Sequence, residues 1–147
     1  MNEDEFHTVA DQTIEGIQSA IDESGADIDY DEVGGVLTLE FENGTKIIFS
    51  KQPPAMQLWM AARSGGFHFD YDSDRQQWLS DSGNNEELYA MLSRLSTEQG
   101  GEEVSLSSPW SEKYIKHLND LAALLDVFSK KSSQVFDFYK NSSTMNA

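Results

Sequence analysis

The apolar residues of this chain change their spacing once, and that change limits the folds open to it. Over residues 3 to 22 they recur every three or four positions, the period of a helix lying on a core. Over residues 27 to 80 they alternate instead, in short stretches separated by turn residues. No gap between these stretches has room for a crossover helix, so the strands must form an antiparallel sheet. The predicted strands cover residues 27–31, 36–42, 45–50, 56–62, 67–72 and 77–80.

Two predicted helices, residues 3 to 22 and 86 to 96, each carry one apolar face. The most economical packing puts both helices on the same face of the sheet and leaves the other face to water. The predicted fold is therefore α+β, a two-layer sandwich of two helices on an antiparallel sheet of about six strands, with a further short strand at 103–106. The apolar positions are Phe6, Val9, Ala10, Thr13, Ile14, Ile17, Ala20 and Ile21 in the first helix, and Leu88, Met91, Leu92 and Leu95 in the second.

One turn and one aromatic residue are predicted in more detail. Asn43-Gly44 predicts a two-residue type I′ hairpin turn, because both residues tolerate a positive φ. In residues 56 to 62, Leu58 and Met60 need the core, which puts Trp59 and its neighbour Gln57 on the solvent-facing side. An exposed tryptophan is typical of a protein interface. Trp78, in contrast, is predicted to be buried.

Acidic residues crowd the start of the chain. The first 42 residues contain thirteen Asp or Glu and no Lys or Arg. On the helical wheel Asp4, Asp11, Glu15 and Asp22 share one line, opposite the apolar face. Alternation puts Asp27, Asp29 and Asp31 on one face of the first strand, so together with Asp22 and Glu23 they are expected to form one continuous anionic surface. Such crowded like charges repel unless solvent, metal or a basic partner offsets them.

Composition excludes several classes of function. A net charge of −16 argues against nucleic acid and anionic membranes as partners, since both would be repelled. The absence of cysteine excludes disulfides and thiolate chemistry. The acidic N-terminus is unlike a targeting peptide, and no apolar run reaches the length of a membrane span, so a cytoplasmic protein is expected. No nucleophile elbow, phosphate-binding loop or His-Glu-x-x-His motif is present, and the chain is predicted not to be an enzyme.

The chain changes character beyond residue 106. Residues 1 to 106 carry 22 acids and 5 bases, whereas residues 107 to 147 carry 4 acids and 5 bases. We therefore divide it into a domain at 1–106 and a C-terminal extension at 107–147. Apolar residues at helical spacing predict a helix over about 109–130, followed by a weakly ordered tail. Docking on the domain, an accessory helix without a distinct function and self-association all remain open for this helix.

Four segments, EFHTVADQ, GGVLTLEFENGTKIIFSKQPP, QLWMAARSGGFHFDY and GEEVSL, occur in the order and spacing of a bacterial frataxin of the CyaY type. The chain resembles that family over residues 1 to about 106. The resemblance implies a frataxin-like sandwich that binds iron through surface carboxylates and regulates iron-sulfur cluster assembly by docking on the cysteine desulfurase. The cluster scaffold protein is a further candidate partner. Slow ferroxidase behaviour has been ascribed to some members, and a monomer with iron-dependent oligomers is expected.

The resemblance also implies site residues, with some departures. The implied metal ligands are Asp22, Glu23, Asp27, Asp29, Asp31, His7 and Asp11, and the implied or expected partner contacts are Asp4, Glu15, Gln57 and Trp59. Where the family often has two glutamates near the end of the first helix, this chain has Gln18 and Ser19. Hard carboxylate oxygens suit Fe²⁺ and Fe³⁺, and an open surface predicts weak binding in which other divalent cations can substitute.

Other interpretations stay open at this point. The acids could be a solvated face that only keeps the protein soluble. The chain could be an acidic adaptor or a DNA mimic that blocks a basic protein, with no role for metal. A calcium-binding domain is disfavoured, because no EF-hand loop is present.

Overall fold

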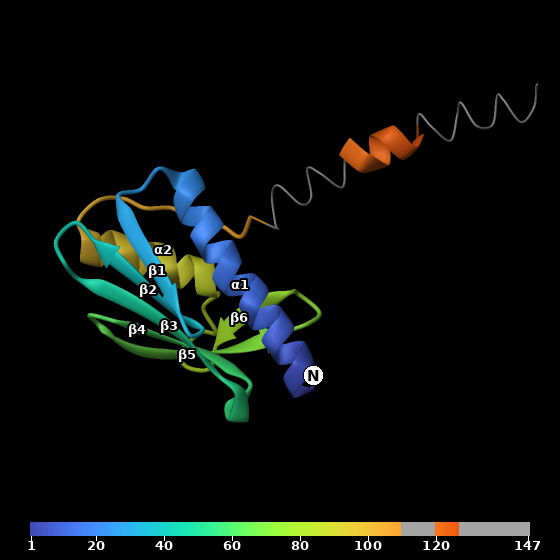
Figure 1. Cartoon of the computed structure of the whole chain (residues 1–147), viewed down its shortest axis with the longest axis horizontal. Helices are drawn as coiled ribbons and strands as arrows, with labels where there is room; N and C mark the ends of the chain where they lie inside the picture. Colours follow the sequence, from blue (N-terminus) through green and yellow to red (C-terminus); the bar gives the residue numbers. More distant parts are fainter. Residues whose placement is uncertain (110–119, 127–147) are drawn as a thin grey trace, which may run out of the picture. The chain divides into compact units, whose positions relative to one another are not determined.

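The structure is a computed structural model, and it describes residues 1–109 and 120–126 (Figure 1). The chain divides into two units, Met1–Pro109 and Trp110–Ala147. The first unit contains all the named helices and strands. In chain order they are α1 (Glu3–Ser24), β1 (Ile28–Val33), β2 (Val36–Phe41), β3 (Lys46–Gln52), the 3₁₀ turn η1 (Pro53–Ala55), β4 (Gln57–Ala62), β5 (Gly65–Asp72), β6 (Gln77–Ser80) and α2 (Leu88–Gly100).

The six strands form one antiparallel sheet in which every strand pairs with its neighbours along the chain. Figure 1 shows α1 and α2 lying against one side of this sheet. Their buried side chains join those of alternate strand positions in a single core. The predicted two-layer α+β sandwich is therefore confirmed, including its open outer face. The core residues from the strands are Ile28, Leu37, Leu39, Phe41, Ile47, Phe49, Leu58, Met60, Phe69 and Trp78.

Local signals at both ends explain the length of α1. Asn2 caps its N-terminus by accepting a hydrogen bond from the Glu5 N–H at 2.8 Å. Three acids in the first turn suit the positive end of the helix dipole. The helix ends at Gly25, whose φ of 68° is the left-handed conformation common after a helix. It is thus two residues longer than the prediction at its C-terminal end.

α2 begins two residues later than predicted, because Glu87 is its cap rather than part of its first turn. The Glu87 carboxylate accepts a hydrogen bond from the Ala90 N–H at 2.9 Å. The helix then continues to Gly100, where the Phe41 ring packs against its last turn. A Cβ at Gly100 would lie 2.9 Å from Phe41 Cδ1, so only glycine fits at this contact.

Trp78 anchors α1 to the far end of the sheet. Its indole is buried, as predicted, and its Nε1 donates a hydrogen bond to Thr13 Oγ1 at 2.8 Å. Thr13 Oγ1 donates in turn to the carbonyl of Val9. The Phe6 ring meets the indole edge to face, with 6.1 Å between ring centroids. The buried indole N–H therefore has a hydrogen-bond acceptor, which is supplied by α1, the helix that covers it.

Two local predictions are wrong. The hairpin after β2 uses three loop residues: the Gly44 N–H bonds to the Phe41 carbonyl, and Gly44, but not Asn43, has a positive φ. This is the type I turn with a following glycine bulge, in which the Asn43 side chain accepts from the Thr45 N–H. Residues 103–106 are not a strand, because hydroxyl groups of α2 take the place of a strand partner. Ser93 and Thr97 accept hydrogen bonds from the N–H groups of Leu106 and Val104.

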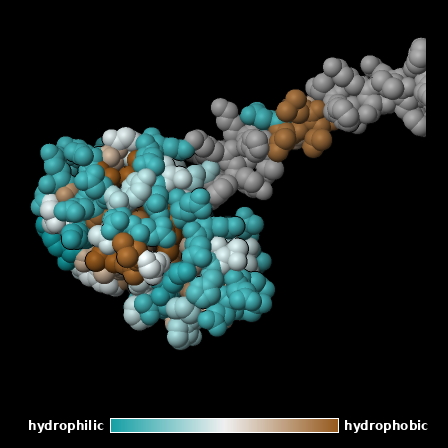
Figure 2. Space-filling view, viewed as in Figure 1, coloured by the Kyte–Doolittle hydropathy of each residue, from teal (hydrophilic) through white to brown (hydrophobic). Residues whose placement is uncertain are grey.

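In the second unit the structure describes residues 120–126, which are helical. Leu121, Leu124 and Leu125 are exposed there, by 40%, 65% and 65%. Figure 2 shows a mostly hydrophobic surface over this segment, and it also shows a hydrophobic patch on the otherwise largely hydrophilic first unit. The remainder of the predicted helix at about 109–130, and the tail after it, lie outside the described residues.

Candidate functional site

The acids implied as metal ligands gather where α1 leads into β1, and we call Asp22, Glu23, Asp27, Asp29 and Asp31 the acidic edge. Asp22 and Glu23 end α1, Asp27 lies in the bend before β1, and Asp29 and Asp31 are on β1 itself. β1 is an outer strand of the sheet, and among the described strands it pairs on one side only, with β2. All five side chains are exposed. Asp27 precedes the strand, whereas the prediction included it as the first strand residue.

Tyr30 separates these acids into two groups. Its hydroxyl lies 2.9 and 2.8 Å from the two carboxylate oxygens of Asp22, to which it donates its proton. Because side chains alternate along a strand, Tyr30 points toward α1 while Asp29 and Asp31 point to the outer face. The acidic edge therefore wraps around β1, instead of lying on one face of it. The hydrogen bond from the hydroxyl to Asp22 raises the pKa of Tyr30, with smaller contributions from desolvation and from the Asp22 charge.

The acidic edge is open rather than cage-like. Among residues 1–109 and 120–126, no three Asp, Glu or His side chains converge closely enough to hold a metal ion. In the register of the sheet Asp29 lies opposite Glu40, while Asp31 lies opposite Thr38. Such a surface can offer an ion one or two carboxylates and leave water in its other coordination positions. The geometry suits weak binding with rapid exchange.

His7 and Asp11, the other implied metal ligands, are brought together by a lysine. The Lys51 ammonium lies 2.7 Å from Asp11 Oδ1 and 3.4 Å from His7 Nδ1. The other ring nitrogen of His7 lies 3.6 Å from a Glu3 carboxylate oxygen. A positive charge supplied by β3 therefore already occupies the space between the two side chains. Sequence reasoning missed Lys51 because it is 40 residues from Asp11 along the chain.

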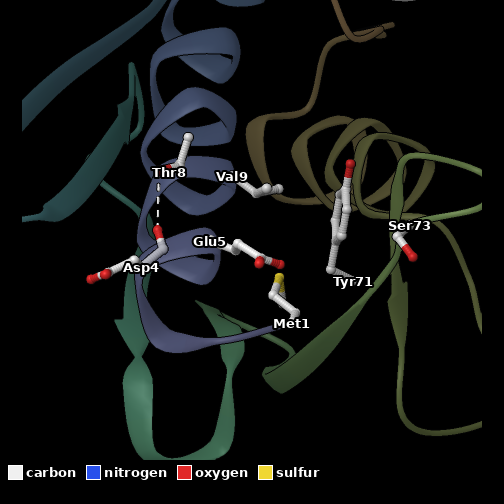
Figure 3. A pocket seen from close by; sticks show the side chains of 7 residues that line it. All are labelled: Met1, Asp4, Glu5, Thr8, Val9, Tyr71 and Ser73. Atoms are coloured by element: carbon white, nitrogen blue, oxygen red, sulfur yellow. Dashed lines mark hydrogen bonds between the residues drawn. The ribbon is translucent and has the colours of Figure 1, made fainter.

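Asp4 lines a hollow between the start of α1 and β5 (Figure 3). The hollow has a volume of about 540 Å³, and its walls are the side chains of Met1, Asp4, Glu5, Thr8, Val9, Tyr71 and Ser73. In Figure 3 the Tyr71 ring faces the helix across it. Partial burial, and secondarily the charge of Asp72, raise the pKa of Tyr71. Of the site residues predicted from the sequence, Asp4 is the one that contributes to this hollow; Glu15 is exposed on α1.

Trp59 belongs to a polar cluster on the outer face of the sheet. Its side chain is 37% exposed, which confirms the predicted orientation, and its ring stacks on His68 with 4.4 Å between centroids. Trp59 Nε1 donates to Gln57 Oε1 at 3.0 Å, and Gln57 Nε2 donates to Asp70 and Asp81, both at 3.1 Å. His68 Nδ1 lies 3.4 Å from Asp81. These contacts fix the orientation of the indole on the outer face of the sheet.

On its β3 side, Trp59 has small and apolar neighbours. Strand register places Ser50 and His68 directly beside Trp59, and Ala61 beside Ile48. Val36 and Ile48 are exposed by 38% and 36%. A chain with a net charge of −16 thus presents an exposed aromatic side chain with uncharged neighbours on β3, while the carboxylates of Asp70 and Asp81 lie at the Gln57 side of the cluster. Asp81 joins the cluster from the loop after β6, a contact that no sequence pattern indicated.

The first unit is similar in sequence to known proteins. A family model described as a frataxin-like domain matches residues 1–102. The chain is 50% identical to the iron-sulfur cluster assembly protein CyaY of Pseudomonas syringae over 107 residues, which are 73% of this chain and 96% of that protein. It is also 50% identical to CyaY of Pseudomonas paraeruginosa over 104 residues, which are 71% of this chain and 95% of that protein.

Two solved structures have the same fold. Frataxin from Psychromonas ingrahamii superposes with a TM-score of 0.67 at 42% identity, covering 74% of this chain and all of that one. Yeast frataxin superposes with a TM-score of 0.51 at 26% identity, covering 65% of this chain and 80% of that one. Within the described residues, no helix combines the length and apolar character needed to cross a membrane.

Proposed function

Since this chain belongs to the frataxin-like family, as a homologue of bacterial CyaY proteins, we propose that it is an accessory protein of iron-sulfur cluster assembly. In this proposal it carries weakly held iron on the acidic edge and docks on the cysteine desulfurase, whose rate it regulates. It acts in the cytoplasm as a monomer, with the cluster scaffold protein as a second candidate partner. It contributes no catalytic group of its own.

The observation that carries the proposal is the acidic edge itself. Five exposed carboxylates surround the end of α1 and the start of β1, and the first 42 residues contain no Lys or Arg. Hard oxygen ligands of this kind suit Fe²⁺ and Fe³⁺, and they also accept other divalent cations. Because the acids in the described part of the chain form no closed cage, a bound ion can be passed to a partner without dismantling a site.

The same acids give a reason for docking on a basic protein. A surface with net negative charge accelerates association with an arginine-rich surface and makes the affinity fall with salt. The outer face around Trp59 and Gln57 offers a second contact, of the aromatic type that often dominates binding energy. Asp4 and Glu15 extend the acidic surface along α1.

Metal and partner would then compete for the same carboxylates. A bound Fe²⁺ neutralises charge that the desulfurase would otherwise meet, so iron can tune the complex. We expect Fe²⁺ to weaken desulfurase binding at fixed ionic strength. An affinity that does not change with Fe²⁺ would show that the two sites are separate.

The competing proposal is an acidic adaptor that covers a basic protein without any metal. An anaerobic Fe²⁺ titration of the isotopically labelled chain, followed by NMR, distinguishes the two. Iron carriage predicts selective broadening of the amide signals from Asp22 to Asp31 at low metal ratios. Diffuse broadening over all acidic segments, suppressed by salt, would instead favour the adaptor.

A further inference from the structure

The Lys51 side chain is held firmly between β3 and α1. Its neighbours on alternate positions of the strand, Ile47 and Phe49, are core residues, and its own side chain is only 19% exposed. A Cβ at Gly35 would lie 3.3 Å from Lys51 Cε, so the absence of a side chain there makes room for the lysine stem. The ammonium therefore emerges at a fixed place beside α1, unlike that of a typical surface lysine.

That place is where a metal ion would sit if His7 and Asp11 were to share one. The ammonium lies 2.7 Å from Asp11 and 3.4 Å from His7 Nδ1, while Glu3 approaches His7 Nε2. A cation is thus already present among the three side chains. Metal bonds from nitrogen and carboxylate ligands are about 2.0 to 2.2 Å long, so an ion bound to both would lie within a few ångströms of the lysine charge. Repulsion at that distance strongly opposes binding.

We propose that Lys51 is a tethered counter-ion that excludes metal from the face of α1 formed by Glu3, His7 and Asp11. Metal is thereby confined to the acidic edge, which begins eleven residues further along the helix, or about 16 Å away at 1.5 Å per residue. This inference rests on the proposed iron binding and assigns its position on the chain. It also makes Lys51, a residue outside the acidic edge, a determinant of where the ion is held.

Substitution of Lys51 provides the test. In a Lys51→Gln variant, anaerobic Fe²⁺ should bind near His7 and Asp11, with broadening of their amide signals at about five- to tenfold lower metal concentration than in the wild type. The size follows from removing one unit charge a few ångströms from a divalent ion in partly screened solvent. Lys51→Arg, which keeps the charge, should behave like the wild type.

Lys46→Gln is the matched control, because it removes the same charge from the exposed start of the same strand. Equal broadening at His7 in the Lys51→Gln and Lys46→Gln variants would overturn the assignment. A measurement on the wild type covers the case in which Lys51→Gln does not fold. Broadening must begin at Asp22 to Asp31 before it reaches His7 and Asp11, and simultaneous broadening of both regions would overturn the assignment as well.

The outcome separates this inference from the proposed function. If the wild type binds Fe²⁺ at the acidic edge and Lys51→Gln gains no binding at His7, the role of Lys51 is excluded. The proposed iron carriage is not affected by that result. Binding that appears at His7 only after Lys51→Gln, with none at the acidic edge in either protein, supports the role of Lys51 and overturns iron carriage. Absence of binding anywhere in both proteins overturns both proposals.

Discussion

The hydroxyl group of Tyr30 lies within hydrogen-bonding distance of both carboxylate oxygens of Asp22, at 2.9 and 2.8 Å. This contact joins the last turn of α1 to the outer strand of the sheet. Gln18, one turn earlier on the helix, makes a second link by donating to Glu32 at 2.8 Å. The acidic edge is thus held in place by polar contacts between the two elements that carry it.

The Tyr30–Asp22 hydrogen bond makes a prediction about the pKa of Tyr30. Its raised pKa means that the folded state favours the neutral phenol. The associated stabilisation is complete below the ordinary tyrosine pKa of about 10 and is lost as the pH rises through the raised value. An Asp22→Asn variant should lower the Tyr30 pKa toward the ordinary value, as measured by NMR titration of the ring carbons. Asp29→Asn removes a nearby charge but no hydrogen bond, and an equal shift in that variant would contradict the account.

Removing the Trp78–Thr13 hydrogen bond should lower the stability of the fold. Thr13→Val preserves side-chain shape but leaves the buried Trp78 N–H without its acceptor, at a cost of about 1 to 3 kcal/mol in the free energy of unfolding. Thr8→Val is the control, because Thr8 makes the same bond to the preceding turn at an exposed position. It should cost about 0.5 kcal/mol or less. Urea denaturation measures both, and equal losses would argue against a role for the indole contact.

The close contact of Gly100 with Phe41 makes a separate prediction about packing. Gly100→Ala should destabilise the fold by about 1 to 3 kcal/mol, since the new methyl group would lie 2.9 Å from the Phe41 ring. Gly66→Ala is a suitable comparison, because a Cβ at Gly66 would meet no atom within 4 Å and the φ of this residue is not positive. Thermal unfolding of the two variants checks this. A Gly100→Ala protein as stable as the wild type would mean that the helix end shifts freely.

Trp59 should matter for docking more than for stability. Trp59→Ala should weaken desulfurase binding by about tenfold or more, as expected for an aromatic anchor. The free energy of unfolding should change by only about 1 kcal/mol, since the ring is partly exposed. Trp59→Phe keeps a ring over His68 but loses the bond to Gln57, so an intermediate affinity is expected. Calorimetric titration of the desulfurase with each variant gives the order of the affinities. An unchanged affinity for Trp59→Ala would exclude this face as the docking surface.

Sequence patterns predicted much of this fold because they report local geometry. Alternation placed Leu58 and Met60 in the core and therefore Trp59 outside it, and the helical stripe identified the buried side of α1. The hairpin type was missed, because Asn-Gly suits both a two-residue turn and a three-residue turn with a glycine bulge. The choice depends on the register of two strands, which the dipeptide alone does not fix.

The contacts around the candidate site were less accessible to sequence reasoning. The acids of the edge were identified as a group, but the Tyr30–Asp22 bond and the position of Lys51 depend on how α1 crosses the sheet. The pairs Lys51–Asp11 and Gln57–Asp81 join residues that are 40 and 24 positions apart. No periodic pattern relates residues at such separations. These contacts show that Asp11, Asp22 and Asp81 each have a hydrogen-bond partner within the fold.

The central claim is that the acidic edge holds iron, and anaerobic calorimetric titration with Fe²⁺ tests it most directly. The variant carries Asp22→Asn, Glu23→Gln, Asp27→Asn, Asp29→Asn and Asp31→Asn. The control removes the same charge from five other exposed acids, Glu42, Asp74, Glu98, Glu102 and Glu103, as the corresponding amides. We expect Fe²⁺ binding to be lost in the edge variant and kept in the control. Undiminished binding by the edge variant, or an equal loss in both proteins, would contradict the claim.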